Sequence, residues 1–249
     1  LYALWDLGLK VGQSVRSLDE MVRMAKTDLT ACTALLEGRY VWGDEALYKE
    51  GAHRFDTEVV KGTGKQFVAD KLAERDERHK RMGDSRYVVE PNVKEGKGGL
   101  RDLHTLFWIG KYVFQVRSVA ELVDAGLLTD KEMRQFARAE NFLWAVRCHL
   151  HLLTKRAEDR LTFDVQREIA ARMRYADRPG RSAVERFMQH YFLHAKMVGD
   201  LTGVFLAHLD DQLAQKGSRF LPSIFTRRKP GKLNGFALDR GRLALPSDD

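Results

Sequence analysis

The chain has 249 residues, with 42 Lys and Arg against 35 Asp and Glu, and 44% of its residues are hydrophobic. This composition excludes disordered, collagen-like and disulfide-rich proteins, and no apolar run reaches the roughly 18 residues that a membrane crossing requires. The length exceeds that of a typical single domain and predicts two packed units. The two cysteines, Cys32 and Cys148, predict buried, reduced thiols in a cytoplasmic protein.

The first forty-five residues are expected to hold a strand and two helices. Residues 2–9 alternate and then run apolar around one acid, which predicts a strand entering a sheet. Ser17, followed three residues later by a glutamate, forms a capping box that starts a helix. Residues 27–38 restart a second helix that ends at a glycine, and residues 39–42 are compatible with a short strand.

Helical spacing continues from residue 44 to residue 82, with a break at the glycines of 62–64. Its last part, residues 71–81, is densely charged and predicts an exposed helix with intrahelical ion pairs. Residues 87–89 are strand-like. A glycine-rich loop follows, and a helix is expected to begin at about Leu100.

Three further helices have clear starts, because Ser118, Thr129 and Ser182 each begin a capping box. The last of these helices is expected to be the longest and to reach about residue 214. Residues 235–245 alternate weakly and predict a small hairpin. The fold class expected from this pattern is α+β and predominantly α-helical.

Most of the excess positive charge lies between Lys216 and Leu233, where six basic residues occur without an acid. Such a stretch can hold nucleic acid through phosphate contacts. Linkers between domains have the same composition, so we expect a linker here and no nucleic-acid partner. A noncatalytic helical module that binds nucleic acid or a protein through this stretch is an alternative interpretation.

Several common catalytic signatures are missing. Residues 62–65 (Gly-Thr-Gly-Lys) lack the first glycine and the final Ser or Thr of a phosphate loop. No Gly-x-Ser-x-Gly elbow occurs. His190 and His194 share a helix face, but no third ligand accompanies them, so we expect packing histidines.

The loop at 90–102 is the strongest candidate for a binding site. Its glycines allow close approach of a ligand, its cations surround them, and a helix begins directly afterwards. This combination suits a triphosphate or pyrophosphate, whereas the alternative is a plain turn that leads into a helix. The candidate nucleotide-binding residues are Lys94, Lys97, Gly98, Gly99, Arg101 and the first-turn acid Asp102.

Asp6 is a second candidate, as a lone carboxylate between apolar neighbours on the expected strand, with Lys10 and Ser14 in the turn that follows. An inward acid on a strand needs a cation or donor. Metal-dependent nucleotidyl transfer uses such acids to hold Mg²⁺. The alternative is an edge acid that faces solvent.

Residues 90–103 resemble the signature of the bacterial PII uridylyltransferase/uridylyl-removing enzymes, which regulate nitrogen metabolism. Residues 4–16, 142–151 and 157–164 are also similar to segments of that family, so the resemblance spreads over residues 1 to about 210. It implies a nucleotidyltransferase fold followed by a helical domain. It also implies Mg²⁺-dependent transfer of UMP from UTP to a tyrosine of PII, with release of pyrophosphate and with Asp6 as the third metal-site acid.

The sequence also departs from the family pattern. The family's Gly-Ser loop and Asp-x-Asp pair should precede residue 1, and no histidine is followed by aspartate as the hydrolase requires. We therefore expect a truncated nucleotidyltransferase remnant at 1–45, a helical domain at 46–215 and a basic linker at 216–249, inactive as an isolated chain. The adenylyltransferase of glutamine synthetase is an alternative that the glycine-rich loop argues against.

Overall fold

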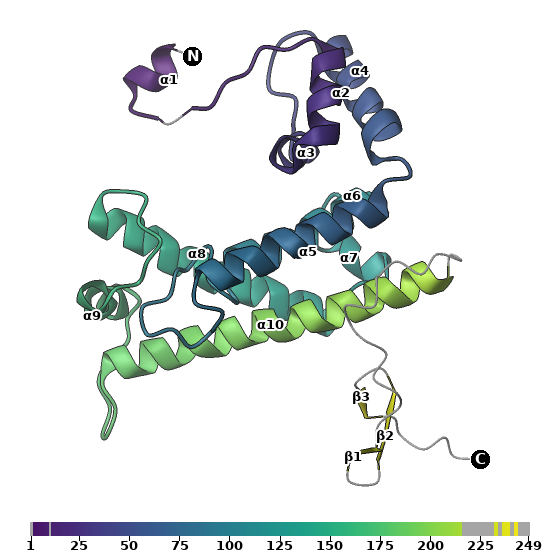
Figure 1. Cartoon of the computed structure of the whole chain (residues 1–249). Coiled ribbons are helices and arrows are strands. Elements are labelled where there is room, and N and C mark those ends of the chain that lie inside the picture. Colours follow the sequence, from purple (N-terminus) through teal and green to yellow (C-terminus); the bar gives the residue numbers. More distant parts are fainter. Residues whose placement is uncertain (1, 10, 216–231, 234–235, 240–241, 244–249) are drawn as a thin grey trace.

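The computed structural model describes residues 2–9, 11–215, 232–233, 236–239 and 242–243 (Figure 1). Its helices are α1 (Tyr2–Asp6), α2 (Leu18–Thr27), α3 (Leu29–Leu36), α4 (Glu45–Arg54), the π-helical η1 (Phe55–Val60), α5 (Gly64–Arg81), α6 (Leu100–Phe114), α7 (Glu121–Asp124), α8 (Asp130–Thr154), α9 (Phe163–Arg172) and α10 (Ala183–Gln215). The strands β1 (Lys232–Leu233), β2 (Phe236–Asp239) and β3 (Arg242–Leu243) pair in this order as antiparallel neighbours, which confirms the expected hairpin. The described chain is predominantly helical, as predicted.

The helix starts follow the capping boxes. At Ser17 and Thr129 the hydroxyl accepts a hydrogen bond from the amide three residues on, and the glutamate there accepts one from the cap amide. Ser182 makes the same pair of bonds at the start of α10. The Ser118 hydroxyl also accepts the Glu121 amide, but the Glu121 carboxylate accepts the amide of Arg117 instead of that of Ser118, and α7 has only four residues. These starts were predictable because the bonding residues lie three positions apart in the chain.

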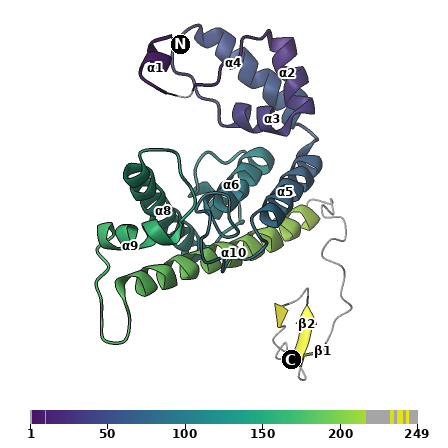
Figure 2. The same cartoon turned by 60° about the vertical axis from the view of Figure 1, so that its left-hand side comes forward.

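α10 extends across the helical bundle in both views (Figures 1 and 2). It packs against α6, α8 and α9, while α5 packs against α6. The interior of this bundle contains fully buried side chains that include Leu100, Leu103, Leu106, Phe136, Leu143, Phe187 and Phe205. Helices α2, α3 and α4 form a second group, which lies beyond α5 and α6 in both views. The glycine-rich loop therefore enters the bundle at the start of α6, its central helix.

Three predicted strands are wrong. Residues 2–9 contain the helix α1, and residues 39–42 and 87–89 are irregular. A strand needs a neighbouring strand for its backbone groups, and the strands of the described residues pair only with one another. The backbone of α1 bonds locally instead, as from the Leu7 amide to the Ala3 carbonyl at 3.2 Å. The expected nucleotidyltransferase remnant therefore has no strand in residues 2–9.

Residues 71–81 form part of the helix α5 with an intrahelical ion pair between Lys71 and Glu74, as predicted, but the expectation that the whole segment is exposed is wrong. Within α5 the residues Lys71, Arg78 and His79 are only 3%, 3% and 8% exposed. The Lys71 ammonium lies 4.4 Å from the centroid of the Trp108 ring, on α6. Positions 71, 78 and 79 recur with the period of a helix and share one face, which the count of charges alone does not reveal.

The remaining expectations have mixed outcomes. Cys32 is buried as predicted, whereas Cys148 is exposed on α8. None of the described helices combines the length and the apolar character that a membrane crossing demands. The basic residues between 216 and 231 lie outside the described residues, and the boundaries at residues 45 and 215 stay predictions.

Candidate functional site

The glycine-rich loop is closed by its own hydrogen bonds. The side-chain oxygen of Asn92 accepts the amides of Lys94 and Glu95, at 3.1 and 2.7 Å. The Asn92 carbonyl accepts the amide of Gly96 at 2.9 Å, and a Cβ at Gly96 would collide with that carbonyl. Asn92 is a typical residue for such a turn because its amide oxygen caps two successive N–H groups. The loop is therefore a rigid, self-bonded unit.

Gly98 is required by the packing of the loop on α10. Its φ angle is +82°, and an added Cβ would lie 2.8 Å from the Cα of Ala195. Its amide donates to the Asp102 carboxylate at 2.8 Å, and the Gly99 amide donates to the Gly96 carbonyl at 2.9 Å. Both amides already have an acceptor within the chain, and a role of Gly98 and Gly99 in nucleotide binding stays a prediction. Gly98 thus allows the loop to pack closely on α10.

Asp102 is the centre of a buried ionic cluster beneath the loop. Its carboxylate accepts a hydrogen bond from Arg78 at 2.5 Å, and the His79 Nε2 atom lies 2.9 Å from the same oxygen. The side chains of Arg78 and Asp102 are each 4% exposed. Burial alone would raise the pKa of Asp102, but the bond from His79, the nearby positive charges and the Gly98 amide lower it. Asp102 is thus a buried anchor of the fold, and its predicted role at a nucleotide stays a prediction.

The lowered pKa of Asp102 predicts a dependence of stability on acid pH. In the unfolded chain an aspartate has a pKa of about 3.9. When folding lowers this pKa, the carboxylate contributes its full stabilisation at any pH above the unfolded pKa. The contribution is lost as the pH falls from the unfolded pKa through the lower, folded pKa. Asp159 behaves in the same way, because bonds from Arg147 and His151 outweigh burial and lower its pKa. Thermal unfolding measured between pH 7 and pH 2.5 should show a falling midpoint below about pH 4.

The variant Asp102→Asn should flatten this acid-induced fall, since it no longer titrates there. Glu77→Gln, at an exposed position of α5, is the matched control and should leave the slope unchanged. A variant without the Asp102 carboxyl that still falls as steeply as the parent chain would contradict the assignment.

Three separate segments of the chain meet beside the loop. The Val93 amide donates to the Asp159 carbonyl at 2.8 Å, and the Leu161 amide donates to the Pro91 carbonyl at 2.9 Å. Asp159 in turn accepts a bond from Arg147 of α8 at 2.7 Å. Residues 90–103, 142–151 and 157–164, which carry the family resemblance, are therefore joined in space.

Their shared surface carries a basic patch, which consists of Lys94, Arg101, His104, Trp144 and Arg147. The Arg101 guanidinium is held 3.2 Å from Glu95, and the Arg147 guanidinium lies 5.2 Å from the centre of the Trp144 ring. Burial lowers the pKa of His104, and the positive charges of Arg101, Arg147 and Lys94 lower it further. These neighbours make the surface around His104 electropositive. Trp144 is 38% exposed beside these cations.

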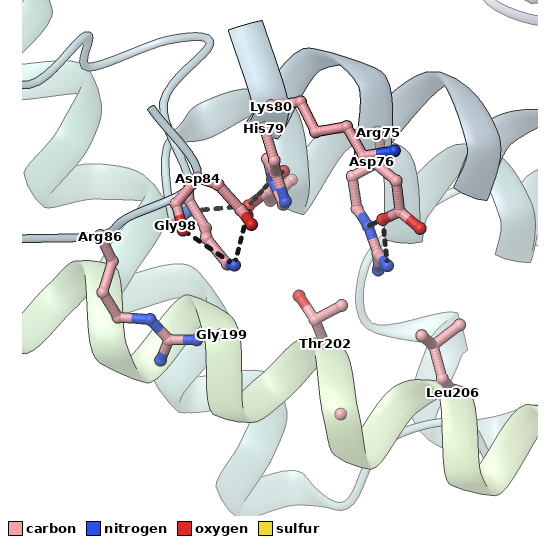
Figure 3. A pocket seen from close by; sticks show the side chains of 13 residues that line it. Arg75, Asp76, His79, Lys80, Asp84, Arg86, Gly98, Gly199, Thr202 and Leu206 are labelled. Atoms are coloured by element: carbon pink, nitrogen blue, oxygen red, sulfur yellow. Dashed lines mark hydrogen bonds and ion pairs between the residues drawn. The ribbon is translucent and has the colours of Figure 1, made fainter. Parts of the chain in front are cut away.

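A cleft of about 430 Å³ lies between α5, the segment that follows α5, and α10 (Figure 3). The loop contributes Lys97, Gly98 and Asp102 to its lining. Its polar lining residues are Arg75, Asp76, His79, Lys80, Asp84, Arg86, Lys97, Asp102 and Thr202. The glycines Gly98, Gly199 and Gly203 complete its walls, with Leu206. None of the basic-patch residues lines this cleft, so the loop contributes to two separate surfaces.

The structure thus divides the predicted nucleotide-binding residues. Lys94 and Arg101 belong to the basic patch, while Lys97 lies 2.8 Å from Asp84 in the cleft. Sequence reasoning missed Arg147, although the resemblance covered its segment. The charged face of Arg78 and His79 was missed as well, and only helical periodicity could have indicated it.

The N-terminal candidates are not brought to the loop. Asp6 is exposed on α1, which lies on the side of α2 and α4 and away from α10 in both views (Figures 1 and 2). Ser14 is exposed in the irregular segment after α1, and Lys10 lies outside the described residues. Among the residues that the structure describes, no three Asp, Glu, His or Cys side chains are grouped as a metal site requires. The magnesium site that the resemblance implies at Asp6 stays a prediction.

Comparison with known proteins identifies the family. A family model described as GlnD PII-uridylyltransferase matches residues 66–206. The whole chain is 69% and 63% identical to the bifunctional uridylyltransferase/uridylyl-removing enzymes of Novosphingobium aromaticivorans and Erythrobacter litoralis, and spans 27% of the length of each. The enzyme of the same name from Rhodospirillum rubrum is 57% identical to the chain over 98% of the chain's length, and the matched segment covers 26% of that enzyme. No solved structure matches significantly. The chain belongs to the GlnD PII-uridylyltransferase family.

Proposed function

We propose that this chain is the helical part of an enzyme that transfers UMP from UTP to a tyrosine of PII and releases pyrophosphate. The observation that carries this proposal is the basic patch, on which the three family-like segments converge. The printed names of the relatives describe uridylyl transfer and uridylyl removal. The adenylyltransferase alternative has no counterpart among these names.

The basic patch supplies what nucleotidyl transfer needs at the leaving group. Negative charge develops on the pyrophosphate as its bond to the α-phosphate breaks, and cations fixed in advance stabilise that charge. Arg101 and Arg147 are fixed in this way by Glu95 and Asp159, at 3.2 and 2.7 Å. Lys94, which lies 3.5 Å from Glu95, adds a third positive charge. In this proposal the three side chains bind the phosphates of UTP.

Asp6, Lys10 and Ser14 enter the proposal as parts of a nucleotidyltransferase fold that is completed by other segments of the longer protein. Asp6 would supply one carboxylate to Mg²⁺, and the described residues hold no further carboxylates grouped with it. No step of the reaction is therefore assigned to the metal here. The isolated chain is expected to transfer no uridylyl group.

The test uses the full-length enzyme that contains this segment. Arg101→Gln and Arg147→Gln should each lower kcat/KM for UTP in PII labelling about 10²-fold, as loss of one transition-state donor does. Arg172→Gln, at an exposed position of α9 outside the basic patch, is the control and should stay within about twofold, as surface substitutions do. Uridylyl removal by the same variants reports whether they are folded. Transfer at the parental rate by both patch variants would refute the proposal.

A further inference from the structure

The cleft between α5 and α10 has a charge pattern that is separate from the basic patch. Arg75 is paired with Asp76 at 2.8 Å, and Lys97 with Asp84 at 2.8 Å. Asp102 is neutralised from below by Arg78 and His79. Every acid of the cleft is therefore already matched by a cation.

Two cations of the cleft have no ion pair of their own, although the charge of Lys80 also acts on Asp84. Within the described part of the chain, the side chains of Lys80 and Arg86 have neither an ion-pair nor a hydrogen-bond partner. Arg86 is half-buried, and its guanidinium rests on α10, where a Cβ added to Gly199 would lie 2.6 Å from Nη1. Figure 3 shows Arg86 directed along α10 toward Gly199, and Thr202 projecting into the cleft. The unpaired guanidinium is thus held in place by packing alone.

The floor of the cleft is kept open by a glycine that packing does not require. Gly203 lies inside the helix α10, and a Cβ added there would meet nothing within 4 Å. Alanine is more favourable than glycine in a helix interior. A larger side chain at residue 203 would occupy the cleft, so glycine preserves its volume of about 430 Å³, which is in the range of small-molecule sites.

We infer that this cleft is a second anion site, which binds a small phosphate-bearing molecule through Lys80 and Arg86. Both cations are free to form charge-assisted hydrogen bonds with phosphate oxygens, and a planar guanidinium can do so with two bonds. The site goes beyond the proposed transfer reaction, because it shares no residue with the basic patch. Its connection to that patch is the buried Arg78, which contacts Asp102 and lies 3.8 Å from Glu95.

The test is a titration of the 249-residue chain, labelled with ¹⁵N, with inorganic pyrophosphate. The amide signals of Gly98, Gly199 and Gly203 should shift in a saturable way. Arg86→Gln and Lys80→Gln should each weaken this binding about tenfold, the loss expected for one charge-assisted hydrogen bond. Arg147→Gln removes a patch cation and should leave the three shifts unchanged, which separates this site from the proposed UTP site.

A matched pair of variants tests the shape of the cleft. Gly203→Leu should abolish the shifts by filling the cleft, whereas Gly203→Ala should keep them and preserve the fold. If Gly203→Leu does not fold, the two cation variants decide. The inference is overturned if pyrophosphate shifts only signals of the basic patch, or if Arg86→Gln binds as tightly as the parent chain.

Discussion

Gly98→Ala is expected to lower the free energy of unfolding by about 3–5 kcal/mol, because the left-handed backbone and the overpacked contact both oppose a side chain. The φ angle of Gly98 is +82°, and the new Cβ would lie within 2.9 Å of three backbone atoms of Ala195. Backbone atoms inside α10 cannot rotate away as a flexible side chain can. Urea denaturation followed by circular dichroism measures the change.

Gly62→Ala is the matched control for this prediction. Gly62 has nearly the same φ angle, +81°, but an added Cβ meets nothing within 4 Å. Only the cost of the left-handed conformation, about 1–2 kcal/mol, should appear there. Equal losses for the two variants would mean that the contact between the loop and α10 contributes nothing.

Asp102→Asn should cost a similar amount, about 3–5 kcal/mol, although it changes the shape of the side chain very little. The substitution removes the close charged partner of Arg78, whose side chain is 4% exposed, and leaves only Glu95 at 3.8 Å. A buried charge that loses its counter-ion retains its full desolvation cost. Chemical denaturation at pH 7 measures the loss.

A double variant distinguishes this electrostatic explanation from a packing defect. Asp102→Asn combined with Arg78→Met should be more stable than Asp102→Asn alone, since no unpaired charge then remains buried. Asp84→Asn, which breaks the exposed pair with Lys97, should change stability little. Additive losses in the double variant would contradict the explanation.

Local signals in the sequence predicted most of the helices correctly. The capping boxes at Ser17, Thr129 and Ser182 form between residues three positions apart, so the local sequence alone is sufficient to predict these helix starts. The start of α6 at Leu100 was predicted from another local signal, the glycines that precede it. Three strands were mispredicted because a segment with alternating apolar residues forms a strand only when a neighbouring strand bonds its backbone N–H and C=O groups.

Burial of charge could not be predicted in this way. The segment 71–81 contains charges of both signs, and composition predicts a solvated helix. The acid that pairs with the buried Arg78 and His79 is Asp102, which lies more than twenty positions further along the chain. Cys148 was mispredicted for a related reason, since apolar neighbours in sequence do not specify which face of α8 meets solvent.

The sequence by itself determined the helical class, the helix starts, the position of the glycine-rich loop and the family resemblance. Only the tertiary structure decided that Lys94 and Arg101 join Arg147 on one surface, while Lys97 and Gly98 line a cleft against α10. Residue type and spacing specify local hydrogen bonds. Which face of a loop or helix meets a distant partner depends on long-range packing. The cost of removing a charge from water is offset only by ion pairs and hydrogen bonds from residues elsewhere in the chain.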